Sequence, residues 1–270
     1  MDLRAFAMGL VFVTMWASAF TSARIIVTEA PPMAALSVRF LISGLIAVAI
    51  ARTLGQSWRL TRAQAGATLL FGICQNALYL GLNFVAMQTV EASLAAIIAS
   101  TMPLLVAFAA WIVFGERLSP LGIAGLAAGF AGVALIMGTR LQGGADPYGV
   151  ALCFLGAVAL TFATLSVRGA SSGGNVLMIV GLQMLVGSAA LVVPAALFET
   201  WEVTLSWRLA AAFVYTLFIP GLAATLVWFL LVRRIGATRA ATFHFLSPFI
   251  GVLVAAVVLG EAIVWTDLVG

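Results

Sequence analysis

The sequence predicts an all-α membrane protein on a ten-helix plan, with nine spans and the start of a tenth in this chain. The helices are expected to form two inverted five-helix repeats. Composition is the first reason, because hydrophobic residues make up 64% of the 270 residues and charged residues only 8%. A soluble domain of this size needs a far more polar surface. The second reason is an internal repeat, since residues 92–116 return as residues 237–261, displaced by 145 positions.

The two copies of this stretch match without a gap at seven positions, including Pro103/Pro248, Gly115/Gly260 and Glu116/Glu261. At about 1.5 Å per residue, either copy can cross a hydrocarbon layer roughly 30 Å thick. The proline removes a helical hydrogen bond midway. Each copy is therefore expected to be a spanning helix with a weak point at its centre, and Gly115 can close the first copy in the left-handed conformation.

The remaining apolar runs complete the plan. The first repeat is expected in residues 1–138, the connecting loop in 139–147 and the second repeat in 148–270, truncated at the start of its fifth helix. Because five spans is an odd number, the second repeat enters the membrane in the opposite orientation. The spans are predicted at about 5–27, 33–51, 66–87, 92–116, 120–137, 148–167, 176–198, 207–232 and 237–259, with a tenth beginning near Thr266.

The arginines predict the orientation of the chain. With the N-terminus in the cytoplasm, nine arginines fall in cytoplasmic segments and three outside, and Arg39 lies within a span. Positive charge accumulates on the cytoplasmic side of membrane proteins, so this orientation is expected. The same arrangement explains the net charge of +4 by topology and lipid headgroups, without a nucleic-acid partner.

Several chemistries are excluded by what the sequence lacks. No lysine is present, so a Walker-type phosphate loop cannot form. No HExxH motif, paired acids or nucleophile with a base is found, which argues against an intramembrane enzyme. Cys74 and Cys153 fall in apolar spans and are expected to be buried free thiols. No cofactor and no metal ion are expected.

Inverted repeats with interrupted helices are typical of secondary transporters, in which related halves move about a site near the midplane. They also occur in passive channels, and the sequence leaves that alternative open. Saturable transport and trans-stimulation would separate the two classes.

The repeats also resemble a known family. Two five-helix units, each with a proline followed twelve residues later by Gly-Glu, are similar to the EamA-type repeats of the drug/metabolite transporter superfamily. Within it the chain most resembles the bacterial YddG-type aromatic amino acid exporters. The resemblance covers the chain apart from the missing tenth helix and implies a multi-pass exporter of the bacterial inner membrane with cytoplasmic termini. The resemblance does not identify substrate-binding residues in this chain.

The third span carries the best candidate surface for a substrate. Gln75, Asn76, Tyr79 and Asn83 fall at i, i+1, i+4 and i+8 and therefore share one helical face. Amides offer donors and acceptors, and Tyr79 adds a ring for stacking. Alternatively, these residues only join helices by hydrogen bonds. Trp228 aligns with Asn83 in the second repeat, so the site would be asymmetric.

His244, the only histidine, precedes Pro248 by four residues. Either it pairs with a carbonyl that the proline leaves free, or it contacts substrate or a proton. Arg39 is expected near the outer end of its span, with its long stem reaching the membrane interface. Further candidates are polar or aromatic residues that could line the same cavity or simply pack: Trp16, Ser100, Thr101, Thr161, Thr164, Tyr215 and Ser247.

The expected cargo follows from the missing charges. No acidic residue lies in the middle of a span, so the cavity is expected to have almost no fixed charge. The predicted partner is a neutral or zwitterionic small molecule, above all an aromatic or other hydrophobic amino acid or related metabolite, with the lipid bilayer as surroundings. The oligomeric state is left open, and a monomer is compatible with the sequence.

Overall fold

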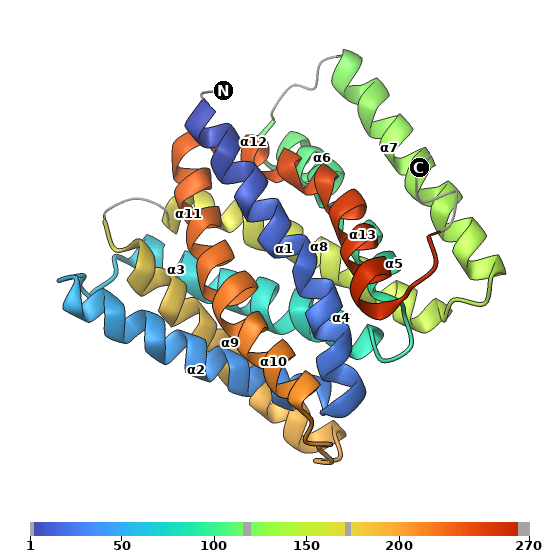
Figure 1. The fold of residues 1–270 in the computed structure, drawn as a ribbon. Helices are drawn as coiled ribbons and strands as arrows, with labels where there is room; N and C mark the ends of the chain where they lie inside the picture. Colours follow the sequence, from blue (N-terminus) through green and yellow to red (C-terminus); the bar gives the residue numbers. More distant parts are fainter. Residues whose placement is uncertain (1–2, 116–119, 171–173, 264–270) are drawn as a thin grey trace.

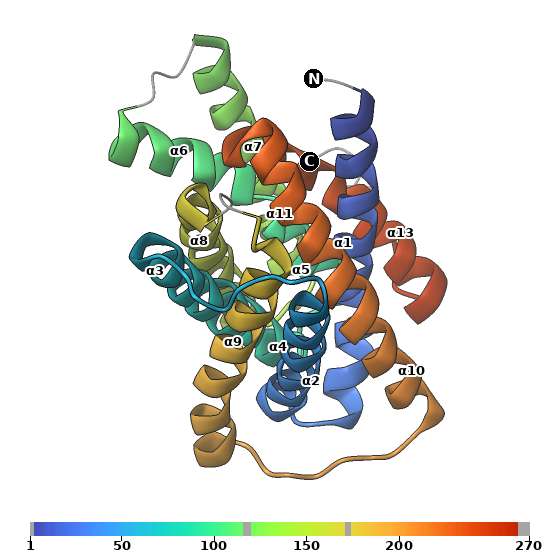
Figure 2. The ribbon, with the colours of Figure 1, turned by 90° about the vertical axis from the view of Figure 1, so that its left-hand side faces the viewer.

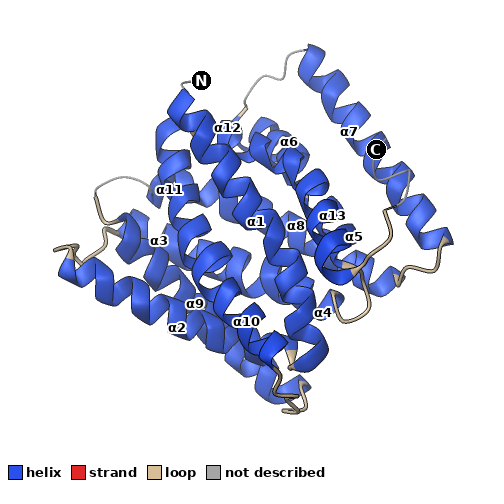
Figure 3. Cartoon of the chain, viewed as in Figure 1, coloured by secondary structure: helices blue, strands red, loops and turns tan. Residues whose placement is uncertain are grey.

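The computed structural model describes residues 3–115, 120–170 and 174–263, and all regular structure in these ranges is helical (Figure 3). Nine helical segments of the described residues are long and apolar enough to cross a membrane. The predicted start of a tenth span near Thr266 lies outside the described residues.

The first repeat begins with α1 (Leu3–Glu29) and α2 (Pro32–Thr53). Its third span is a composite, in which a π-helix, η1, interrupts an α-helix. The fourth span is broken into two α-helices, and α7 is the fifth. These elements are α3 (Arg62–Phe71), η1 (Gly72–Leu80), α4 (Gly81–Ala86), α5 (Ala92–Ala99), α6 (Met102–Phe114) and α7 (Pro120–Gln142).

The second repeat follows the same order. Its third span again contains a π-helix, η2, and its fourth is again interrupted, here by the 3-10 helix η3. Its elements are α8 (Pro147–Ala170), α9 (Val176–Phe198), α10 (Trp207–Thr216), η2 (Leu217–Ala223), α11 (Ala224–Ile235), α12 (Ala237–Ala241), η3 (Thr242–Leu246) and α13 (Ser247–Leu259).

The helix starts repeat with the period of the sequence. Helix α2 begins at Pro32 and α9 at Val176, 144 positions later, while η1 begins at Gly72 and η2 at Leu217, 145 positions later. The predicted all-α fold of two repeats is therefore confirmed, and the repeat extends to a π-helical segment that the sequence did not predict.

The predicted weak points are present in both fourth spans. Pro103 is the second residue of α6, where its missing N–H costs no helical hydrogen bond. The chain turns at Ser100 and Thr101, whose hydroxyls donate to carbonyls of their own helix. Gly115 closes α6 with φ of 64°, in the left-handed conformation expected for it, and Gly260 closes α13 with φ of 71°.

Helix α1 runs through the molecule between α10–α11 on one side and α13 on the other, and α2 lies along α9 (Figures 1 and 2). Glycines permit the close approach of α2 and α9, because a Cβ on Gly181 would stand 2.9 Å from the backbone nitrogen of Val48. Helix α7 lies at the edge of the bundle in Figure 1 and is mostly exposed. The first, second, third and eighth spans meet at the centre.

Carboxylates from the second repeat cap helices of the first. Glu199, just after α9, accepts hydrogen bonds from the backbone nitrogens of Met33 and Ala34 at 2.6 and 2.8 Å. Glu261, just after α13, accepts from those of Ala92 and Ser93, both at 2.9 Å. Each carboxylate satisfies free N–H groups at a helix start and faces the positive end of its dipole. The two repeats are thus tied together at helix ends.

The loop before α8 is held by a carboxylate outside the spans. Thr89 donates a hydrogen bond of 2.7 Å to Asp146, and the backbone nitrogens of Tyr148 and Gly149 donate to it as well. The Thr89 hydroxyl, together with these N–H groups, lowers the pKa of the Asp146 carboxyl below its ordinary value. This contribution to stability is therefore present above the ordinary carboxyl pKa and is lost as the pH falls through the lowered one.

Candidate functional site

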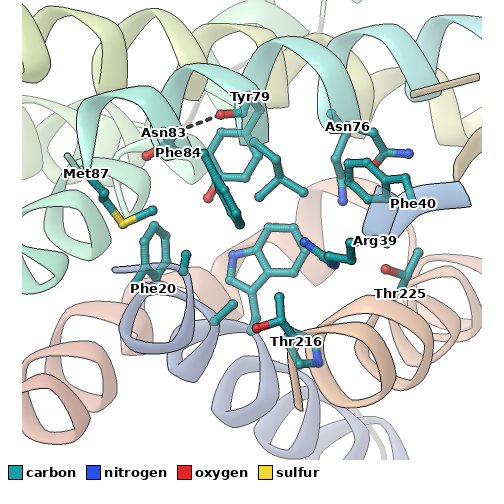
Figure 4. A pocket seen from close by; sticks show the side chains of 16 residues that line it. Phe20, Arg39, Phe40, Asn76, Tyr79, Asn83, Phe84, Met87, Thr216 and Thr225 are labelled. Atoms are coloured by element: carbon teal, nitrogen blue, oxygen red, sulfur yellow. Dashed lines mark hydrogen bonds between the residues drawn. The ribbon is translucent and has the colours of Figure 1, made fainter. Parts of the chain in front are cut away.

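A small buried cavity lies where the first, second, third and eighth spans meet (Figure 4). Its volume is about 30 Å³, room for about two water molecules. No amino acid fits in that space, so the lining side chains close the site in this conformation. The lining consists of Trp16, Ala19, Phe20, Ala23, Arg39, Phe40, Gln75, Asn76, Tyr79, Leu80, Asn83, Phe84, Met87, Thr216, Pro220 and Thr225.

Aromatic rings form much of the wall. The rings of Trp16 on α1 and Tyr79 on η1 are parallel within 3°, with centroids 6.0 Å apart. Phe40 lies under the guanidinium of Arg39, with its ring centroid 4.8 Å from Cζ. Such surfaces bind flat apolar groups by stacking and attract cations over their faces.

Polar atoms in this wall lack partners. Among the described residues, Nε of Arg39 and Oδ1 of Asn83 have no hydrogen-bond partner, and Nε1 of Trp16 and the hydroxyl of Tyr79 have none other than each other. All four side chains are buried, with 6% exposure or less. Each such atom costs about 1–3 kcal/mol, and buried polar groups without partners are rare in native structures. Gathered in one cavity, these groups are available to hydrogen-bond a ligand or water.

The two asparagines on the polar face of the third span have different hydrogen-bond partners. Nδ2 of Asn76 donates to the backbone oxygen of Gln183 on α9 at 2.9 Å and also to the Gln183 side-chain oxygen. Asn76 therefore joins two helices. Nδ2 of Asn83 donates to the backbone oxygen of Tyr79 in its own helix at 2.8 Å, which leaves Oδ1 for the cavity (Figure 4). Gln75 is buried and lines the cavity as well.

The two π-helices flank this cavity. Segment η1 contributes Gln75, Asn76 and Tyr79, and η2 contributes Pro220 from the opposite side. A π-helical turn carries an extra residue per hydrogen-bonded ring and is frequent at functional sites. Pro220 gives a local cause in η2, since its ring blocks the ordinary helical bond, whereas η1 contains no proline and gave no sign in the sequence.

Arg39 is not where the sequence analysis placed it. Its side chain is 4% exposed and lines the cavity, so the expectation that it reaches the membrane interface is wrong. The expectation of a cavity almost without fixed charge is wrong for the same reason. Packing explains the difference, because α2 lies against η2 and Gly221 leaves room for the guanidinium. A Cβ on Gly221 would stand 3.2 Å from Nη2.

His244 lies beside the cavity, outside its lining. It sits in a cage of three aromatic rings, with centroids 5.2 Å from Phe12, 5.4 Å from Trp16 and 5.5 Å from Trp228. Among the described residues Nδ1 has no hydrogen-bond partner, so the carbonyl partner expected from Pro248 is not found at that atom. His244 reaches the cavity only through Trp16.

The predicted hydroxyl residues are not brought to the cavity. Ser100 and Thr101 donate to Ile97 and Ile98 at the break of the fourth span. On α8, the hydroxyl of Thr161 donates to Ala157 at 2.9 Å and that of Thr164 points to the sulfur of Met102. Short hydroxyl side chains commonly satisfy themselves on their own helix in this way.

Three further candidates also lie elsewhere. Tyr215 hydrogen-bonds Ser18 at 2.7 Å and belongs to a separate lateral groove between α1, α10 and α13. Trp228 packs on Phe12 and His244. Ser247 is fully buried outside the lining, and its hydroxyl has no partner among the described residues.

Several residues of the cavity lining were not predicted from the sequence. Phe84 and Met87 extend the third-span face by one turn, so its period could have included them. Thr216 and Thr225 flank η2, and no pattern in the sequence distinguishes them from packing residues.

Two inverted repeats with interrupted helices around a buried central site are the architecture typical of membrane transporters. Comparison with family models makes this specific. The EamA-like transporter family matches residues 3–138 and 147–270, and the chain belongs to that family.

Individual relatives agree with this assignment. The chain is 26% identical over 262 residues to the uncharacterized transporter YvbV of Bacillus subtilis (strain 168), covering 96% of this chain and 85% of that protein. It is also 26% identical over 255 residues to the uncharacterized inner membrane transporter YedA of Escherichia coli (strain K12), covering 92% and 81%. One solved crystal structure, 21% identical, has a TM-score of 0.75 over 100% of this chain and 93% of the other, which shows the fold.

Proposed function

We propose that the protein is a secondary transporter of the inner membrane that exports zwitterionic small metabolites, above all aromatic or other hydrophobic amino acids, by alternating access. The observation that supports this most is the closed cavity at the meeting point of the repeats, with its parallel aromatic rings and its unpaired polar atoms. We do not extend the proposal to neutral cargo, because Arg39 places a charge in the wall.

The lining matches the parts of such a cargo. An aromatic or aliphatic side chain can pack against the rings of Trp16 and Tyr79. An α-ammonium group can donate to Oδ1 of Asn83, and a carboxylate can accept from the free N–H groups. The present volume of about 30 Å³ requires the wall to move before cargo enters, which alternating access supplies.

The small volume of the cavity supports a transporter over a permanently open pore, because the lining leaves no room for an amino acid to pass at this site. The decisive experiment uses the purified protein in liposomes with a panel of labelled amino acids. A transporter should show saturable uptake that rises several-fold when the liposomes are preloaded with unlabelled phenylalanine. Linear, non-saturating flux without trans-stimulation would instead identify a channel, and no flux of any amino acid would reject the proposed cargo.

A further inference from the structure

The most unusual group in the cavity is the guanidinium of Arg39. It is buried at 4% exposure, and among the described residues it has neither a hydrogen-bond partner for Nε nor an ion-pair partner. Its contact with the Phe40 ring is a weak substitute for an anion. An arginine cannot lose its proton under ordinary conditions, so this charge stays in place. A buried charge without a counter-charge is strongly destabilising.

The internal repeat has an uncharged residue at the position that corresponds to Arg39. Gln183 on α9 follows Arg39 by 144 positions, the same displacement that relates the starts of α9 and α2. Each of these two side chains contacts a π-helix of the other repeat: Gln183 accepts a hydrogen bond from Asn76 of η1, and Arg39 packs against Gly221 of η2. The second repeat therefore has a neutral amide facing Asn76 where the first has a guanidinium facing Gly221. The positive charge of Arg39 is a departure from the symmetry of the scaffold.

We propose that Arg39 is the anchor for a carboxylate of the cargo, so that the site selects small organic acids with an aromatic or aliphatic body. The inference rests on the proposed transport function and narrows it. Arginine suits this task because its planar fork can donate two parallel hydrogen bonds to one carboxylate. An ion pair formed in a buried cavity keeps more of its strength than one at the surface.

The other unpaired atoms complete the recognition. Nε1 of Trp16 is a donor, and the hydroxyl of Tyr79 can donate as well, so an anionic group has several hydrogen bonds available. Oδ1 of Asn83 can accept a hydrogen bond but cannot donate one. No other unpaired atom in the described lining is of this kind. No acidic side chain lines the cavity within the described residues. An α-ammonium group therefore has one acceptor in this lining, whereas a carboxylate has the guanidinium and further donors.

The test compares four probes that share a phenyl ring: phenylalanine, 3-phenylpropionate, phenylalaninamide and phenethylamine. Binding to the purified wild-type protein in detergent is followed by intrinsic tryptophan fluorescence. We expect phenylalanine and 3-phenylpropionate to bind at least ten-fold more tightly than the amide and the amine. Equal affinity for phenylalanine and its amide would overturn the proposal, as would the lack of saturable binding by both carboxylates.

The matched variant is Arg39→Gln, which copies the residue that the second repeat has at this position. We expect it to lose the preference for carboxylates, while Arg39→Lys keeps part of it because the charge remains. Removal of an unpaired buried charge should also leave the ligand-free melting temperature equal or higher. A carboxylate preference that persists in Arg39→Gln would overturn the assignment.

Different results would reject the transport function and the role of Arg39. If the wild-type protein transports phenylalanine and its amide equally well, the transport function stands and the role of Arg39 is rejected. If the carboxylates bind selectively but no probe crosses the liposome membrane, the anchor stands and the transport proposal is rejected.

Discussion

The two asparagines of the third span offer a sharp test, because the structure gives them different roles. Asn76 pairs with Gln183 on α9, whereas Asn83 presents an unpaired Oδ1 to the cavity. We expect Asn83→Ala to weaken cargo binding with little effect on stability. We expect Asn76→Ala to lower stability and to affect all cargoes alike.

The expected losses of affinity and of stability follow from the hydrogen bonds that each substitution removes. A hydrogen bond to a charged group contributes about 1.5–3 kcal/mol, so losing the acceptor for an α-ammonium should weaken phenylalanine binding roughly ten- to hundred-fold. In Asn83→Ala the only other loss is a bond to Tyr79 within the same helix. Asn76→Ala leaves the side-chain oxygen of Gln183 buried without its donor, which costs about 1–3 kcal/mol of stability.

The assay combines phenylalanine affinity, measured by tryptophan fluorescence, with the melting temperature in the same detergent. Both substitutions remove the same side-chain atoms from the same helical face, so each variant is the control for the other. Phe198→Ala is a second control, since that side chain is 78% exposed and lies at the end of α9, away from the central cavity. If Asn83→Ala lowered the melting temperature as much as Asn76→Ala and left affinity unchanged, the division of roles would be refuted.

Three further predictions address topology, the histidine and the helix caps. A cysteine at Trp58 should be shielded from an impermeant thiol reagent in intact cells, whereas one at Gly144 should react, and the opposite labelling would reverse the orientation inferred from the arginines. His244→Gln should keep downhill transport, because the ring lies outside the cavity lining; complete loss of flux in folded protein would contradict this. Glu261→Ala and Glu199→Ala should each lower stability by about 0.5–2 kcal/mol, because two backbone N–H groups lose their acceptor. The loss should appear as a lower melting temperature. Glutamine at either position should cost less stability, and equal losses for alanine and glutamine would argue against capping.

The sequence by itself determined the number of described spans, their order and the interruption of both fourth spans. These features depend on local properties, namely the length of apolar runs, the rigid ring of Pro103 and the freedom of Gly115 to adopt a positive φ. The period of the repeat also fixed which elements correspond. None of these properties requires knowledge of how the helices pack.

Only the tertiary structure decided what faces the cavity. The face shared by Asn76 and Asn83 was visible in the sequence, yet their separate roles depend on Gln183, which lies more than a hundred positions away. The location of Arg39 depends on the rotation and depth of α2, which are set by its packing on α9 and by the space at Gly221. Such contacts join distant residues, so a local pattern cannot encode them. For that reason the sequence predicted the scaffold well and placed Arg39, the buried cation of the described residues, wrongly.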